Sequence, residues 1–144
     1  MKVNKSKYQN RVVNDLYFLI DSENMIHEYS GIQIPDEDIS ELFLSELNAI
    51  CCELDSDNML LFELENARKL RLGIYCEKLM QVFLKLHSKT ELLERNWQII
   101  REGITIGELD FIIKIGERIS GLEMAFKCYA QFAPGIECWM GPRR

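Results

Sequence analysis

Apolar residues recur every three or four positions in the N-terminal part of the chain. This spacing predicts amphipathic helices over residues 12–20, 36–53 and 70–86. The last segment is the strongest, because its apolar side chains share one helical face: Leu72, Tyr75, Cys76, Leu79, Met80, Phe83 and Leu86. Residues 55–58 break the pattern, and the polar residues 90–95 indicate where the helical region ends.

Beyond residue 96 the chain becomes rich in β-branched and aromatic residues. We expect strands over residues 97–101, 104–115 and 122–132, with a loop at 116–121 that has a glycine at each end. Consecutive strands with short connections most simply form an antiparallel meander. Because helices come first and strands follow, the pattern predicts an α+β (α/β-like) fold in which N-terminal helices pack on a small mixed sheet.

Length and composition favour one folded domain over residues 1–144. The chain has 144 residues, of which 47% are hydrophobic, and this is enough to bury a core. Its formal net charge of -6 argues against nucleic-acid binding over the whole surface, because such binding requires a basic surface. A local binding groove is compatible with this charge. A site for a divalent cation is itself built from carboxylates, so it would contribute to this negative net charge.

The cysteines and the N-terminus predict a reduced, intracellular protein. The five cysteines include no C-x-x-C pair, and His27 and His87 lie far apart, so we do not expect a structural zinc site. We expect the thiols to be small apolar core residues. The chain shows no signal peptide and no run of the ~20 apolar residues that a membrane crossing needs. These features predict a soluble cytoplasmic protein without a membrane partner.

Two carboxylates stand on one face of the second predicted strand. Glu108 and Asp110 are two positions apart in an apolar segment, and side chains alternate in a strand, so both point to the same side. Burying neighbouring carboxylates is unfavourable without a cation nearby. On the third predicted strand, Glu123 and Lys127 also share a face. A hairpin of the two strands would gather these carboxylates and the lysine, as at a magnesium (or manganese) site.

Spacing alone leaves a second interpretation open. Strands that alternate glutamate and lysine often form an ion-paired surface that faces solvent, and the charge pattern by itself favours that interpretation. The apolar residues on both sides of the carboxylates favour the metal site instead.

The same residues resemble the signature of the PD-(D/E)XK nuclease superfamily. The likeness consists of glycine, glutamate, an aliphatic residue and aspartate at 107–110, then a short loop and a strand that ends in Lys127. It extends to Asn96-Trp97-Gln98 on the preceding strand and to Glu77 on the preceding helix. More closely, the chain resembles a bacterial family, the domain of unknown function 1853 family, which is assigned to that superfamily. The stretches that carry this closer resemblance are 12–16, 72–77, 107–111, 122–127 and 139–142.

The resemblance implies a restriction-endonuclease-like core and a metal-dependent nuclease that cleaves DNA or RNA with Mg²⁺ or Mn²⁺. Asp110 would be the main metal ligand, Glu123 a second ligand and Lys127 the catalytic lysine. Glu77 would be an accessory catalytic carboxylate on the helix. Glu108 would be a further or outer ligand of the metal.

The chain departs from the superfamily pattern at one position and from the family pattern at its end. The second acid usually stands two residues before the lysine, where this chain has Ala125, and Glu123 lies ~6–7 Å further along the strand. Members of the closer family continue beyond the Gly-Pro motif, whereas this chain ends at Arg144, so we expect a short or truncated member. An alternative function therefore stays open. It is a catalytically inactive nuclease-fold protein that binds nucleic acid or protein, or that assembles as a homo-oligomer through a free sheet edge.

Overall fold

A computed structural model describes the backbone of residues 7–22, 28–29, 32–33, 37–124, 130–131 and 139–140, and the side chains of 7–22 and 39–124. Within these ranges the chain forms four helices, which are α1 (Arg11–Asp21), α2 (Glu37–Leu54), α3 (Asn58–Ala67) and α4 (Leu72–Leu86). An antiparallel sheet follows, made of β3 (Glu91–Arg101), β4 (Ile104–Ile115) and β5 (Arg118–Leu122). Two short antiparallel pairs are also described: β1 (Glu28–Tyr29) with β2 (Ile32–Gln33), and β6 (Ala130–Gln131) with β7 (Trp139–Met140).

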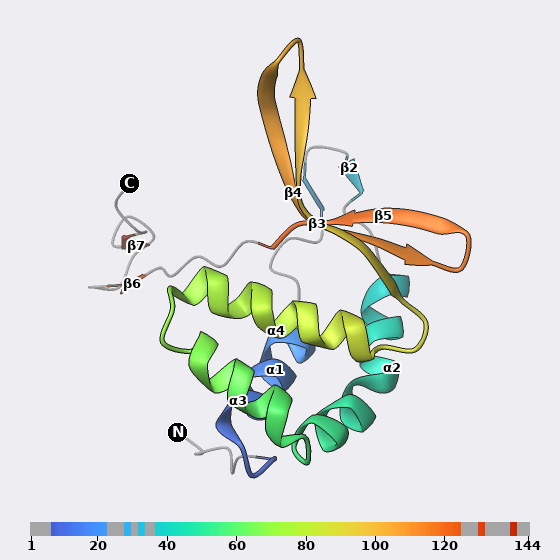
Figure 1. Ribbon diagram of the computed structural model, residues 1–144. Helices are drawn as coiled ribbons and strands as arrows, with labels where there is room; N and C mark the ends of the chain where they lie inside the picture. Colours follow the sequence, from blue (N-terminus) through green and yellow to red (C-terminus); the bar gives the residue numbers. More distant parts are fainter. Residues whose placement is uncertain are drawn as a thin grey trace.

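The helices pack against one another, and the three-stranded sheet lies on one side of α4 (Figure 1). The β3–β4 hairpin projects away from the helices, and the β4–β5 hairpin runs in a different direction. Four helices against a small antiparallel sheet confirm the predicted α+β architecture for the part of the chain described. Among the described helices, none has both the length and the hydropathy that a membrane span requires.

The three predicted helices are present as α1, α2 and α4, and α3 is an addition. The spacing of residues 58–67 predicts no helix, because apolar side chains lie on more than one side of it. Met59 and Phe62 are 84% and 73% exposed, whereas Leu64 is fully buried. The side chain of Asp57 starts α3 by accepting hydrogen bonds from the backbone N–H groups of Met59 and Leu60, at 2.9 and 3.0 Å.

The sheet confirms the antiparallel meander and corrects three details of the prediction. Every pair in the described sheet is antiparallel, so the sheet is not mixed. β3 begins at Glu91, inside the segment 90–95 that the pattern assigns to the end of the helical region. β5 occupies 118–122, where the pattern predicts a loop, and ends where the third strand is predicted to begin.

Turn geometry explains the misplaced third strand. Gly116 has a φ of 59°, in the left-handed region, so Gly116 and Glu117 are enough to reverse the chain between β4 and β5. Glu102 and Gly103 form the corresponding turn between β3 and β4, with φ of 52° and 79°. The polar residues after Gly116 therefore enter the strand directly.

The core lies between the helices and β4. Phe111 and Ile113 of β4 are fully buried and belong to the same apolar cluster as Phe83 of α4. His87, which follows α4, is also buried, and its Nε2 lies 3.1 Å from the carbonyl oxygen of Leu42. The inner half of β4 is thereby fixed to the helices, and the outer half continues into the projecting hairpin.

The cysteines described by the structure are free thiols. Cys51 and Cys76 are buried, as predicted for core residues, whereas Cys52 is exposed; Cys128 and Cys138 lie outside the described residues. Burial raises the pKa of Cys51 to about 11. Burial is also the main reason why the pKa of Cys76 is raised. Both buried thiols therefore stay protonated at neutral pH and are poor nucleophiles.

Candidate functional site

Asp110 lies in β4 at the boundary between the core and the projecting hairpin. Its side chain is half-buried, while the next residue, Phe111, is fully buried. Glu108, two positions earlier, is exposed. Alternation along a strand points Glu108 and Asp110 to one side of β4, so the strand carries two carboxylates as neighbours.

β3 lies along one side of this pair. The register pairs Gln98 with Glu108 and sets Asn96 across from Asp110. Asn96 has a φ of 51°, a left-handed conformation that asparagine adopts more readily than most residues. Residues 96–98 of β3 thus run next to the two carboxylates of β4.

The segment after β5 lies along the other side. Leu122 pairs with Phe111, so the following residue, Glu123, comes level with Asp110. The backbone N–H of Met124 donates a hydrogen bond to Oδ2 of Asp110 at 2.6 Å. The β4–β5 hairpin therefore brings Asp110 and Glu123 next to each other.

The carboxylates on this hairpin interact electrostatically. Desolvation raises the pKa of Glu123, and the negative charges of Asp110 and then Glu108 raise it further. Neighbouring negative charges disfavour ionisation of Glu123, and a nearby cation would favour it. The three carboxylates thus give this hairpin a local excess of negative charge.

Two of the predicted catalytic residues are not brought to this hairpin by anything the structure describes. Lys127, like Ala125, lies outside the described residues. Glu77 is half-buried in α4, where its charge acts on Cys76. Within the described part of the chain, no hydrogen bond or ion pair connects Glu77 to Asp110.

The described carboxylates do not form a complete metal site by themselves. Among the described side chains, no group of three His, Cys, Asp or Glu side chains is arranged to hold a metal ion. Asp110 and Glu108 are the two carboxylates whose charges act on Glu123. A pair of this kind suits a cation that keeps several waters or substrate oxygens as its other ligands.

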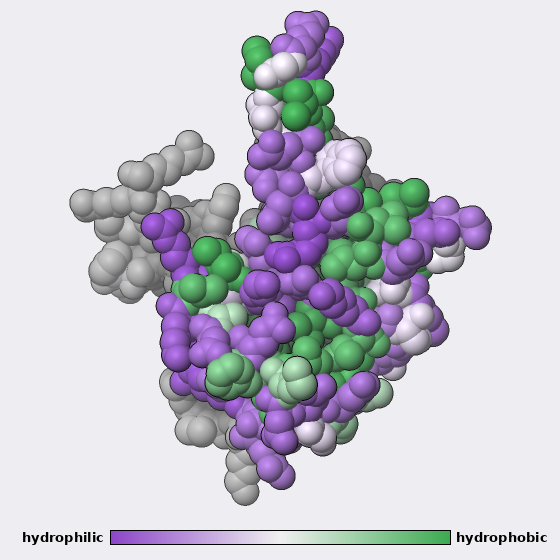
Figure 2. Space-filling model, viewed as in Figure 1, coloured by the Kyte–Doolittle hydropathy of each residue, from purple (hydrophilic) through white to green (hydrophobic). Residues whose placement is uncertain are grey.

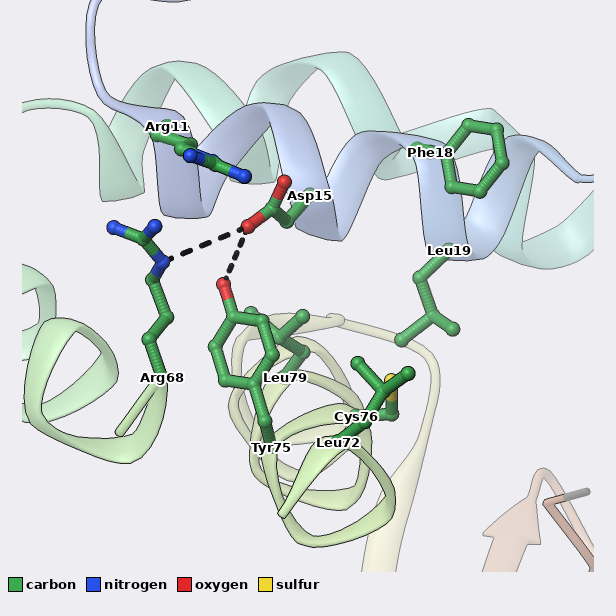
Figure 3. Close-up of a pocket in the computed structure, with 9 residues that line it drawn as sticks. All are labelled: Arg11, Asp15, Phe18, Leu19, Arg68, Leu72, Tyr75, Cys76 and Leu79. Atoms are coloured by element: carbon green, nitrogen blue, oxygen red, sulfur yellow. Dashed lines mark hydrogen bonds and ion pairs between the residues drawn. The ribbon is translucent and has the colours of Figure 1, made fainter. Parts of the chain in front are cut away.

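A cavity of about 350 Å³ lies between α1 and α4 (Figure 3). The hydrophobic pattern of the sequence does not predict it. Inside it the Tyr75 hydroxyl donates a hydrogen bond to Oδ2 of Asp15 at 2.8 Å, although the two residues are 60 positions apart. Two signals point to it in retrospect. Asp15 interrupts the apolar pattern of the first helix, and both residues lie in stretches that carry the family resemblance.

Comparison with known proteins gives one match. Residues 14–144 match the model of a family described as Domain of unknown function (DUF1853). No curated protein and no solved structure matches the chain. The matched range covers nearly the whole chain and includes every predicted site residue from Glu77 to Lys127. The chain therefore belongs to the DUF1853 family.

Proposed function

We propose that the chain is a metal-dependent phosphodiesterase that hydrolyses DNA or RNA, with the restriction-endonuclease-like core of the PD-(D/E)XK superfamily. The observation that supports this most is the pairing of Asp110 with Glu123. The register of the β4–β5 hairpin sets them level, and the Met124–Asp110 hydrogen bond ties the two segments together. Glu108 adds a third negative charge close enough to act on Glu123.

These donors fit Mg²⁺ or Mn²⁺. Hard divalent cations prefer oxygen ligands, and Mg²⁺ is usually held by one or two carboxylates together with waters and substrate phosphates. Asp110 and Glu123 supply such a pair. Because the described residues contain no ready group of three ligands, we expect weak metal affinity in the absence of nucleic acid and tighter binding in its presence.

The protein's own residues have separate roles in this proposal. A bound divalent cation would lower the pKa of a water and stabilise charge on the scissile phosphate. Asp110 is held in position, because the Met124 N–H fixes its Oδ2. Glu123 approaches the same point from the neighbouring segment and is exposed, so it can adjust to a substrate. Lys127 would orient the attacking water, and Glu77 would assist from the helix.

A cation would also remove an electrostatic obstacle to substrate binding. The chain has a formal net charge of -6, and nucleic acid is a polyanion, so the two repel each other. A divalent ion on the carboxylates changes the sign of the local charge where the phosphate must lie. We therefore expect both binding and cleavage of nucleic acid to depend on divalent metal.

Replacement of Glu123 by glutamine should impair catalysis without destabilising the fold. Glutamine keeps the shape but removes the charge, so we expect magnesium-dependent cleavage to fall by on the order of 10²-fold. Without metal the variant should be at least as stable as the wild type, because ionised Glu123 is disfavoured by its neighbours. Cleavage of radiolabelled DNA and RNA, with thermal melting at neutral pH, measures both effects.

Glu117→Gln is the matched control, since it removes one exposed carboxylate from the β4–β5 turn without touching the pair. Mn²⁺ should raise the melting temperature of the wild type and of this control, and should raise that of Glu123→Gln much less. Equal metal responses in all three proteins would contradict the proposed site.

A binding or assembly role is the second candidate, and the projecting β3–β4 hairpin favours it. Large apolar side chains are exposed along this hairpin: Trp97 (49%), Ile100 (62%), Ile104 (67%) and Ile106 (60%). Figure 2 shows the corresponding apolar surface on the projecting arm. Exposed apolar patches of this kind mark contacts with other chains.

Self-association through the hairpin predicts a concentration-dependent mass. Light scattering should show a wild-type dimer that dissociates on dilution, and the double change Ile104→Ser, Ile106→Ser should weaken it by at least about tenfold, since two exposed apolar side chains are removed from water in the contact. A wild-type protein that stays monomeric at every concentration would exclude a homo-oligomer formed by this surface.

A further inference from the structure

The cavity between α1 and α4 has a polar end and an apolar end (Figure 3). Four polar side chains lie at one end, Arg11 and Asp15 of α1, Arg68 after α3, and Tyr75 of α4. The other end is mainly leucine and aromatic surface, from Phe18, Leu19, Leu72 and Leu79. The volume of about 350 Å³ lies at the low end of the range of small-molecule pockets, roughly 300–1,000 Å³.

The carboxylate of Asp15 is fixed in the cavity. Its Oδ2 accepts the Tyr75 hydroxyl at 2.8 Å, and Nε of Arg68 lies 4.0 Å from the same oxygen. Burial and this hydrogen bond raise the pKa of Tyr75, so the hydroxyl stays protonated and remains the donor. Arg68 is shared, because its Nη1 also contacts Glu65 at 2.8 Å. Asp15 therefore presents a positioned negative charge at one end of the cavity.

Arg11 supplies a positive charge one helical turn away. It lines the same end of the cavity, and its guanidinium group points toward Asp15 and Arg68 (Figure 3). Within the described residues Arg11 makes no hydrogen bond or ion pair, although residues four apart on a helix are neighbours. Arg11 and Asp15 thus place a cation and an anion at the same end of the cavity, with no ion pair between them.

The apolar end is open at its mouth. Phe18 is 69% exposed and Leu72 is 51% exposed, and both line the cavity. Leu79, deeper in the cavity, is buried. A ligand with an apolar body would cover this surface and gain the free energy of removing it from water.

We propose that this cavity binds a free amino acid with a large apolar side chain. Its carboxylate contacts Arg11 and the remaining N–H groups of Arg68, its ammonium group contacts Asp15, and its side chain packs on Phe18 and Leu72. A simple anion would meet the charge of Asp15, and a simple cation would meet two guanidinium groups. A zwitterion with an apolar body matches all three parts of the cavity.

L-leucine and three analogues test each part separately. Leucine is compared with 4-methylpentanoate, which lacks the ammonium group, 3-methylbutylamine, which lacks the carboxylate, and L-alanine, which lacks the apolar body. Titrations followed by the methyl NMR signals of Leu19, Leu72 and Leu79 report binding at this cavity. We expect leucine to shift these signals and each analogue to bind at least about tenfold more weakly, the effect of losing one charge-assisted or apolar contact.

Two variants that each remove one charge identify the polar contacts. Arg11→Gln should weaken leucine binding about tenfold, since it removes a guanidinium that pairs with no other side chain in the described part of the chain. Asp15→Asn keeps an oxygen acceptor for Tyr75 but removes the charge, so it should bring leucine to the level of 4-methylpentanoate. Arg101→Gln, at the tip of the projecting hairpin, is the control and should bind like the wild type.

The proposal does not depend on the metal site, so Asp110→Asn should leave leucine binding unchanged. Methyl signals that do not move at tens of millimolar leucine, in a protein shown by melting to be folded, would overturn it. Equal affinity for leucine and for both charge-deleted analogues would also overturn it, because only apolar surface would then be recognised.

Discussion

Replacement of Asp110 by asparagine should lower magnesium-dependent cleavage of nucleic acid by on the order of 10³-fold or more. The proposed cation would stabilise the negative charge of the transition state by several kcal/mol. Each loss of about 1.4 kcal/mol of this stabilisation lowers the rate roughly tenfold. Asparagine retains a side-chain oxygen that can accept the N–H of Met124, so the hairpin should keep its shape. Cleavage assays at saturating Mg²⁺, with circular dichroism for the fold, measure the two effects.

The control for this substitution is Glu102→Gln, which removes an exposed carboxylate from the β3–β4 turn. It should cleave at the wild-type rate. If Asp110→Asn cleaves as fast as the wild type, the activity belongs to another site or to a contaminant. If neither the wild type nor the variants cleave, while the protein is folded and binds nucleic acid, the non-catalytic alternative gains support.

Phe111→Ala should give the largest loss of stability along β4, about 3–5 kcal/mol. Phe111 is fully buried in the cluster that joins the sheet to the helices, its strand partner is Leu122, and the guanidinium carbon of Arg95 lies 5.8 Å from its ring centre. Truncation leaves a cavity at the point where Asp110 and Glu123 are held. Urea denaturation followed by circular dichroism gives the free energy of unfolding.

Ile104→Ala is the matched control, since it shortens an apolar side chain on the same strand where that side chain is 67% exposed. Its effect should stay within about 0.5 kcal/mol, as for most surface substitutions. A Phe111→Ala variant that loses less than about 1 kcal/mol would show that the sheet is not packed on the helices as described.

The spacing of apolar residues predicts some of the helices but not all of them. Most of the apolar face from Leu72 to Leu86 is buried, and its spacing predicts α4 nearly to the residue. α3 has no such single face, because Met59 and Phe62 remain in water. Its start depends on a local signal instead, the Asp57 cap, which spacing does not detect.

The strands show a different limit. Alternation within one strand predicts that Glu108 and Asp110 share a side, and it needs no knowledge of the rest of the fold. The position of the third strand depends on the backbone of Gly116, whose left-handed φ allows a short turn. The composition of residues 116–121 fits a longer loop equally well. Composition therefore predicts the start of the third strand at residue 122, whereas β5 begins at Arg118.

The two sites differ in the same way. Glu123 and Asp110 belong to neighbouring segments of one hairpin, so their proximity depends on contacts that are local in the sequence. The contact of Asp15 with Tyr75 joins residues 60 positions apart through the packing of α1 on α4. Periodicity assigns Tyr75 to an apolar face, which is correct for its ring but says nothing of the partner of its hydroxyl group.

The position at which Mn²⁺ binds tests most directly whether Asp110 and Glu123 hold a divalent cation. As a paramagnetic ion, Mn²⁺ broadens the amide NMR signals of the residues nearest to it. If Asp110 and Glu123 hold the metal, substoichiometric Mn²⁺ first removes the signals of Glu108 to Phe111 and of Glu123 and Met124, and leaves that of Gly103 sharp. Glu123→Gln should abolish this selectivity. Broadening spread evenly over the acidic surface, or centred on residues away from the β4–β5 hairpin, would contradict it.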